Sequence, residues 1–240
     1  MAAKLISAGN FRWLFAETLV IVLGVLIALG LNDYWTDRQD RLLAIDYIQR
    51  IEYEVNGDLQ NLQNSFRPRL RAKREALEAI LPVVRGRAPV PEDLNDFLLN
   101  VSRGGIFGGT LATLANNTTF EELRATGNLR LIRDPDLRIA IVRYYADGEY
   151  QINRLRGRFT DYVSFVLSVI PGELRDDMDL DAINEFGVEF AMQRLLSEEF
   201  RRLANEEYNK MLFMENFDWQ SPAESLLGQL GAYRLKLEGS

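Results

Sequence analysis

Hydrophobic residues are concentrated in one long run near the N-terminus, from Phe11 to Leu31. Within this run only Arg12 and Glu17 are charged, and both lie near its start. A hydrocarbon core of about 30 Å needs roughly 20 helical residues to cross it. The run therefore predicts one transmembrane helix that ties the rest of the chain to a membrane.

A cleaved signal peptide is the main alternative for this run. Signal peptides have an apolar stretch of about 7–15 residues and small residues at the cleavage site. Here the stretch is longer and leads into Tyr34 and Trp35, which with Trp13 at the other end are typical of interfacial residues. A buried core helix would be unusual at the N-terminus. We therefore predict an N-terminal tail over residues 1–10 and an uncleaved anchor over 11–35.

The charges on either side of the run set the expected orientation. Lys4 and Arg12 lie before its uncharged part. After it, acidic and basic residues are interleaved: Asp33, Asp37, Arg38, Asp40 and Arg41. Because Lys and Arg favour the cytoplasmic side, we expect a bacterial inner-membrane protein with its N-terminus in the cytoplasm and its soluble part in the periplasm.

Beyond the anchor, apolar residues recur at helical steps of three and four residues: Ile45, Ile48, Ile51, Val55, Leu59, Leu62, Phe66 and Leu70. This period predicts that the helix continues as a stalk over residues 36–84 and packs along the body. The opposite face carries charges: Arg38, Asp40, Arg41, Asp46, Arg50, Glu54 and Asp58. Pro68 should kink or break this helix. A coiled-coil dimer is an alternative, but the repeat is short and its flanking charges are mixed.

Residues 85–240 are expected to form a helical soluble domain. The predicted helices are Glu92–Val101, one from Thr119 to Gly127, Pro135–Ile170, Asp181–Leu196, Glu198–Glu215 and Ser221–Leu237. The pattern shows no alternating strand. The fold class is therefore all-α: one transmembrane helix, a long stalk helix and a helical bundle.

Local signals mark several of these helix ends. Thr119 with Glu122, and Ser221 with Glu224, fit capping boxes in which a hydroxyl and a carboxylate each accept from a helix-end amide. Gly127 is typical of a helix C-terminus. Asp134 before a proline is typical of an N-cap.

Composition excludes several function classes. The net charge is −7, whereas a nucleic-acid partner calls for a basic face. The chain has no Cys and no His. These absences exclude disulfides, thiolate zinc sites, iron–sulfur clusters, histidine-ligated haem, and mechanisms of the Ser-His-Asp and Cys-His type. No catalytic, metal-binding or cofactor-binding residue is predicted.

Two features of the anchor are candidate functional elements. Glu17 could relay a proton or an ion, but its place near the edge favours an interfacial carboxylate. Gly24, Ala28 and Gly30 present small residues that allow another helix to approach closely in the bilayer. The alternative is ordinary composition, because glycine is common in such helices.

Three further patterns in the soluble part were weighed as sites. The glycine-rich stretch 104–109 lacks the lysine of a phosphate-binding loop and is expected to be a hinge or a tight packing site. The acidic residues Asp176, Asp177, Asp179 and Asp181 fail as a calcium loop because Ala182 stands where glycine is required. Aromatic residues could line a pocket but at helical spacing are more often core: Tyr144, Tyr145, Tyr150, Phe159, Tyr162 and Phe165.

Two stretches carry a family resemblance. Glu17–Trp35, ETLVIVLGVLIALGLNDYW, is similar to the anchor of a family of uncharacterised single-span bacterial membrane proteins. Phe120–Tyr145, FEELRATGNLRLIRDPDLRIAIVRYY, resembles that family's helix, its TGNLRLI turn and its following helix with paired tyrosines. The resemblance implies architecture and membrane location, and it implies no activity.

These observations lead to a functional expectation. The favoured hypothesis is a non-catalytic accessory or scaffolding subunit that stabilises a larger inner-membrane complex. The suggested host is an energy-transducing complex, either photosynthetic or respiratory. Its partners would be membrane lipid and other integral membrane subunits, and no nucleic acid. The alternative is a membrane-tethered periplasmic sensor or a ligand- or peptide-binding module. An enzyme that uses carboxylates alone ranks third, because no acidic pair stands out.

Overall fold

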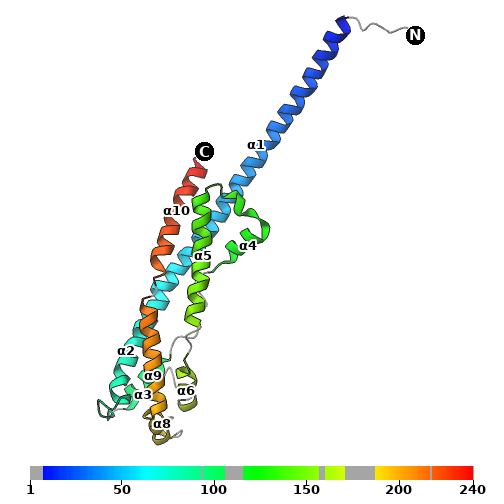
Figure 1. Cartoon of the computed structure of the whole chain (residues 1–240). Coiled ribbons are helices and arrows are strands. Elements are labelled where there is room, and N and C mark those ends of the chain that lie inside the picture. The colour runs from blue at the N-terminus through cyan, green and yellow to red at the C-terminus, as the bar shows by residue number, and fades with distance from the viewer. Residues whose placement is uncertain are drawn as a thin grey trace, which may run out of the picture.

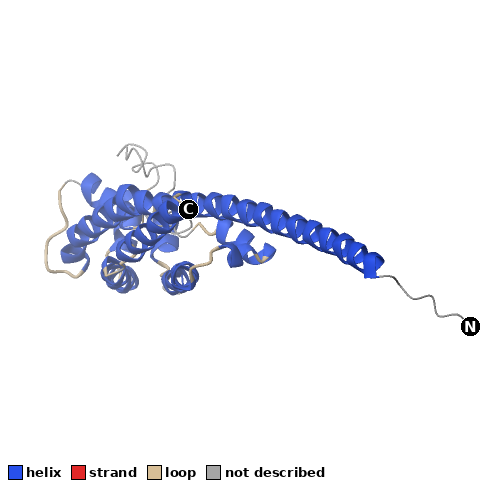
Figure 2. Ribbon diagram, turned by 90° about the horizontal axis from the view of Figure 1, so that it is seen from above, coloured by secondary structure: helices blue, strands red, loops and turns tan. Residues whose placement is uncertain are grey.

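A computed structural model describes residues 8–92, 94–105, 116–156, 160–170, 187–216 and 218–239. Every secondary-structure element in these ranges is helical, which confirms the all-α prediction (Figure 2). The elements are α1 Ala8–Asn61, η1 Leu62–Phe66, α2 Arg67–Val84, α3 Leu94–Gly104, α4 Thr118–Thr126, η3 Asn128–Leu131, α5 Pro135–Arg156, α6 Tyr162–Val169, α8 Val188–Leu195, α9 Glu198–Glu215 and α10 Gln220–Glu238.

Helix α1 has two halves with different surroundings. Its N-terminal half extends far beyond the other helices (Figure 1), and the large apolar side chains between Phe15 and Trp35 are exposed. From Ala44 onward one face of the helix is buried, including Ile48, Ile51 and Val55, whereas Tyr53 on another face is exposed. The predicted continuation of the apolar helix into the body is thus confirmed.

Pro68 distorts the long helix without ending it. The five residues Leu62–Phe66, shortly before Pro68, form a π-helical turn that joins α1 directly to α2. The backbone stays in the right-handed helical region at Asn61, Phe66 and Arg67. A proline lacks an amide hydrogen and its ring meets the carbonyl four residues earlier. The π turn changes the hydrogen-bond register at this point, so the helix continues to Val84 and the expected break does not occur.

The body packs around this long helix at two levels (Figure 1). Helices α10, α5 and α4 surround the second half of α1, whereas α3 and α9 pack against α2, with α6 and α8 beside α9. One buried core runs through both levels. Its largest fully buried hydrophobic side chains include Ile48, Ile51, Phe66, Leu77, Ile80, Tyr162, Phe200 and Trp219.

The bounds of three helices test the sequence pattern further. Helix α9 spans the predicted Glu198–Glu215, and the Ser197 hydroxyl accepts from the Phe200 amide at its start. The prediction of a single helix from Pro135 to Ile170 is wrong, because α5 ends at Arg156 and a separate helix, α6, begins at Tyr162.

The start of α8 and the end of α6 are each explained by the backbone conformation of one residue. Gly187 has a φ of 101°, a conformation that favours glycine, so α8 begins at Val188 instead of continuing from the predicted start at Asp181. Residues 171–186 lie outside the described chain. Ile170 is extended, as expected for a residue that precedes a proline.

The helix caps differ in part from the sequence prediction. Gly127 ends α4 with a φ of 70°, and the Asp134 carboxylate accepts from the amides of Asp136 and Leu137, as predicted. Neither capping box forms. Asp218 caps α10 through the Gln220 and Ser221 amides. A residue distant in sequence takes the place of the box at Thr119, as the next section describes.

Candidate functional site

The most distinctive surface of the chain is the protruding half of α1. The helix that includes it is long and apolar enough to cross a membrane, and none of its most apolar window is buried against the body. A core helix would be covered by other elements. The exposed window thus excludes the buried-core alternative for this segment.

The anchor residues singled out in the sequence all lie on this uncovered helix. A Cβ added at Gly24 or Gly30 would meet nothing within 4 Å. The side chains of Trp13, Tyr34 and Trp35 are exposed, and so are Glu17 and Ala28. No described residue of the body covers these positions. Their roles in helix packing and at the membrane interface remain predictions.

A second candidate site lies inside the body, where two carboxylates of α1 meet two tyrosines of α5. The Tyr145 hydroxyl donates to Oε2 of Glu54 at 3.0 Å, and the Tyr144 hydroxyl donates to Oδ2 of Asp58 at 2.8 Å. The backbone amide and the hydroxyl of Thr119 both donate to Oε1 of Glu54, at 2.8 and 2.7 Å. We call these five residues the carboxylate–tyrosine cluster.

This cluster corrects two sequence expectations. Glu54 and Asp58 were placed on the charged face of the stalk, but both are buried. Thr119 was expected to cap its own helix with Glu122, but its amide and hydroxyl bond to Glu54. Carboxylates stabilise the N-terminus of a helix, so Glu54 serves α4 as a cap supplied by another helix. In the sequence, the two carboxylates one helical turn apart and the paired tyrosines were the pattern that could have predicted this cluster.

The electrostatics of the cluster favour a structural role. Burial, together with the charge of Asp58, raises the pKa of Tyr144 far above its ordinary value. Burial and the charge of Glu54 do the same to the pKa of Tyr145. Both hydroxyls therefore stay protonated and keep donating. A general acid or base instead needs a pKa near the working pH.

The lower level of the body contains a buried ion pair between Lys73 of α2 and Glu207 of α9. Thr160 donates to the other oxygen of this carboxylate, and Lys210 lies 3.3 Å from Oε1. Burial lowers the pKa of Lys73, and Glu207 opposes that effect. Burial alone would raise the pKa of Glu207, but Lys73, Thr160 and Lys210 lower it. The pair joins α2 to α9 in the core.

The remaining sequence candidates resolve as packing features where the structure describes them. A Cβ at Gly104 would lie 2.7 Å from the Tyr162 hydroxyl and 2.9 Å from Cδ2 of Leu77, so this glycine is a tight packing site. Tyr144, Tyr145, Tyr162 and Phe165 are core, whereas Tyr150 is 61% exposed. Residues 106–109, Phe159 and the acidic residues 176–181 lie outside the described chain.

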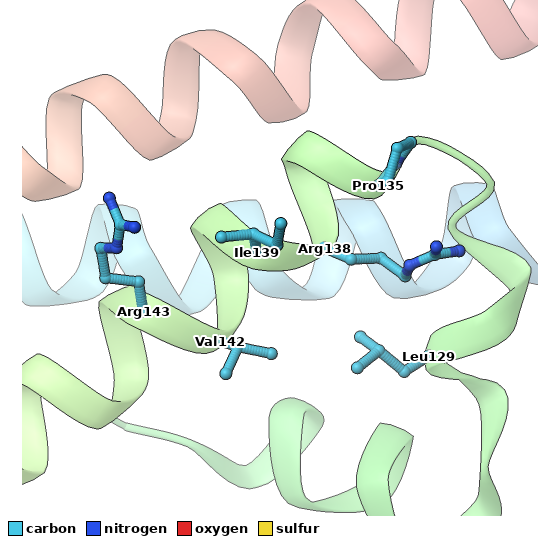
Figure 3. A pocket seen from close by; sticks show the side chains of 6 residues that line it. All are labelled: Leu129, Pro135, Arg138, Ile139, Val142 and Arg143. Carbon is cyan, nitrogen blue, oxygen red and sulfur yellow. The ribbon is translucent and has the colours of Figure 1, made fainter.

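Two surface cavities lie at the end of the body that faces the protruding helix. One, of about 440 Å³, is lined by Leu129, Pro135, Arg138, Ile139, Val142 and Arg143 (Figure 3). We call it the α5 groove. The other, of about 480 Å³, is mostly charged and is lined by Arg133, Asp134, Pro135, Asp136, Tyr233, Lys236 and Leu237. Sequence reasoning identified neither, because each combines residues of separate elements.

Comparison with known proteins gives no relative on which to base a function. No protein-family model, no curated protein and no solved structure matches the chain. Its function is therefore inferred from its own residues and geometry.

Proposed function

We propose that this chain is a non-catalytic, membrane-anchored accessory subunit that stabilises a larger protein complex of the bacterial inner membrane. The N-terminal half of α1 crosses the bilayer, with the N-terminus in the cytoplasm and the body in the periplasm. The family resemblance of the anchor supports the membrane location. A photosynthetic or respiratory complex is the suggested host, in which this chain supplies structure and the other subunits hold the cofactors.

The observation that carries the proposal is exposed apolar surface on α1 both within the anchor and, after the polar residues 36–41, at the edge of the body. Beyond Trp35, the side chains of Leu42 and Leu43 are 58% and 40% exposed. These positions lie about 10–12 Å past Trp35 at a helical rise of about 1.5 Å per residue, outside the hydrocarbon core. Exposed apolar side chains that lipid does not cover indicate contact with another protein. A protein partner that continues from the bilayer onto the body would cover both.

The interior of the body also supports a role through contact. Within the carboxylate–tyrosine cluster the polar side chains bond to one another, and in the separate buried pair Lys73 bonds to Glu207. They hold α1 to α4 and α5, and α2 to α9. Buried polar networks of this kind specify and rigidify one packing arrangement, which suits a subunit that presents a fixed surface.

Gentle extraction of the complex tests the proposal. Native membranes are solubilised in mild detergent, the chain is recovered through a C-terminal tag, and co-purifying proteins are measured by mass spectrometry. We expect stoichiometric recovery of one membrane complex. A matched control replaces residues 13–31 with a polyleucine helix of equal length, which keeps membrane insertion but removes the native helix surface. Recovery of the native chain alone, as a monomer or homodimer, would contradict the proposal.

One observation favours a second candidate function, a membrane-tethered periplasmic binding module. The charged cavity beside Tyr233 has about 480 Å³, which is within the usual size range of small-molecule sites. A thermal-shift screen of polar metabolites on the full chain in detergent would test it. A saturable shift that is lost in Lys236→Ala, with no co-purifying complex, would favour this candidate over the subunit.

A further inference from the structure

The α5 groove combines an apolar floor with two cationic side chains. Figure 3 shows Val142 of α5 and Leu129 of η3 facing each other, with the Arg138 side chain extending away from Val142 on the Leu129 side and Arg143 on the other side of Val142. Ile139 and Val142 are 56% and 41% exposed, whereas Ile141 between them in sequence is fully buried. Exposed apolar side chains gathered in one groove indicate a surface that another molecule covers.

The two arginines of the groove lack acidic partners. No carboxylate in the described part of the chain pairs with Arg138 or Arg143, although the net charge of the whole chain is −7. Arg138 uses one N–H to bond the Ile132 carbonyl at 2.9 Å, which leaves its other donors available. Because guanidinium groups recognise carboxylates through paired hydrogen bonds, these two side chains select an acidic occupant.

The height of the groove favours a polypeptide over a lipid. The bond from Tyr145 to Glu54 places that part of α5 about 28 Å past Trp35 along α1, at a helical rise of about 1.5 Å per residue. The ion pair between Arg133 and Asp37 shows that α5 starts at the end nearer the anchor. Ile139 therefore lies roughly 19 Å beyond Trp35. Polar headgroups extend only about 5–8 Å beyond the hydrocarbon core.

We infer that the α5 groove docks a segment of the partner membrane protein in which an apolar side chain is flanked by carboxylates. This inference rests on the proposed function, since it names the surface through which the body meets its partner. The apolar side chain of that segment would lie over Leu129, Ile139 and Val142, and its carboxylates would pair with Arg138 and Arg143. A second copy of this acidic chain is disfavoured by like charge.

Site-specific cross-linking in the native membrane tests the occupant. Val142 is replaced by p-benzoylphenylalanine in the full chain, cells are irradiated, and the cross-linked peptide is mapped. We expect one segment of a membrane protein with Asp or Glu within four residues of the attachment point. A cross-link to lipid, a cross-link to a second copy, or no cross-link to the recovered partner would overturn the inference.

Charge reversal separates this inference from the proposed function. R138E/R143E should reduce partner recovery at least tenfold, whereas the control R71E/R87E, with the same change in charge at exposed sites far from the anchor, should leave recovery unchanged. I139S/V142S changes no charge and does not disturb the Arg138 bond, and it should reduce recovery similarly if the fold is retained by its melting temperature. Reversing the mapped carboxylates of the partner to Arg should restore recovery with R138E/R143E.

The two proposals fail in distinguishable ways. If the unmodified chain recovers no partner, the proposed function is wrong. If the unmodified chain and both groove variants recover the same partner equally, the groove inference is wrong and the proposed function stands on the anchor.

Discussion

Glu54 accepts two hydrogen bonds from Thr119, one from its backbone amide at 2.8 Å and one from its hydroxyl at 2.7 Å. The two residues are 65 positions apart. Helix α4 thus starts correctly only when α1 is in place beside it. The cap of one helix is supplied by the surface of another, so local and tertiary structure form together.

Removal of this cap should destabilise the body strongly. Glu54→Ala leaves the Thr119 amide and the Tyr145 hydroxyl buried without an acceptor, at a cost of about 1–3 kcal/mol each. We expect a total loss of about 2–6 kcal/mol in the free energy of unfolding, measured by urea titration of the full chain in detergent. Glu54→Gln retains one acceptor oxygen and should lose less than half as much. Equal losses in the two variants would show that the carboxylate position does not matter.

The paired tyrosines offer a test on a single helix. Tyr145→Phe removes one donor to Glu54 while keeping the buried ring, and should cost about 1–2 kcal/mol. Tyr150→Phe on the same helix α5 removes a hydroxyl from an exposed ring and should change the unfolding free energy by less than about 0.5 kcal/mol. Thermal unfolding followed by circular dichroism compares the two. A similar melting temperature for both variants would argue against the cluster as a source of stability.

The buried ion pair predicts a specific effect of substitution. Lys73→Met leaves the Glu207 carboxylate buried without its main partner and should destabilise the body by about 3–5 kcal/mol. The double variant Lys73→Met/Glu207→Leu removes both charges and should recover most of that loss. Chemical unfolding of wild type, both single variants and the double variant measures the coupling. A double variant no more stable than Lys73→Met would show that the loss came from packing and not from the unpaired charge.

The same pair predicts a pH dependence at the acid end. The folded state lowers the pKa of Glu207 below its ordinary value of 4.5, so its contribution to stability is fully present above about pH 4.5. That contribution is lost as the pH falls through the folded pKa. The stability difference between wild type and Glu207→Gln should therefore shrink below pH 4.5. Glu198→Gln, at an exposed carboxylate, should follow the wild-type curve throughout.

Two glycines in helices should respond to alanine with opposite signs. At Gly104 an added Cβ would lie 2.7 Å from the Tyr162 hydroxyl, which donates to the Val101 carbonyl. Overpacking of this kind costs about 1–3 kcal/mol. At Gly57 nothing lies within 4 Å of the added atom, so Gly57→Ala should stabilise the helix by about 0.5–1 kcal/mol. Melting temperatures that move in the same direction would contradict this assignment.

The small residues of the anchor give a test in the membrane. Gly24→Leu/Ala28→Leu fills the face on which another helix could approach closely, and it should reduce partner recovery at least fivefold without reducing membrane insertion. Val22→Phe/Leu29→Phe adds bulk on the face that carries none of the three small residues Gly24, Ala28 and Gly30, and should leave recovery unchanged. Quantitative mass spectrometry after mild solubilisation compares the two variants. Equal recovery would mean that these small residues reflect composition only.

The fold was predictable where a helical period of apolar residues is bounded by residues that typically start or end a helix. The apolar positions of α1 from Ile48 to Val55 have a helical period, and Gly127 and Asp134 mark ends that the structure contains. At Pro68 the structure contains a distortion and no break, because a π turn can absorb the missing amide without ending a helix. The error at α5 arose because apolar spacing alone cannot show where a long pattern divides into two helices.

The sites were less predictable because their members meet only in three dimensions. Glu54 and Asp58 looked like part of a solvated face, since a charged residue on a helix is usually exposed. Their acceptors are satisfied by residues more than fifty positions away, including Thr119 and Tyr144. The α5 groove likewise joins Leu129 to Val142 across a chain turn. Single-helix patterns contain no information about such encounters.

The packing of α1 against α10 determines when this protein can complete its fold during synthesis. The first helix of the core lies beside the last, and the Tyr233 hydroxyl accepts from the Arg133 amide close to the chain's end. At about 5–20 residues per second, the ribosome needs roughly 8–32 s to extend the chain from Asn61 to Gln220. During that interval the apolar face of α1 lacks the cover that α10 provides, so this face is exposed to solvent or to other proteins until α10 has been synthesised.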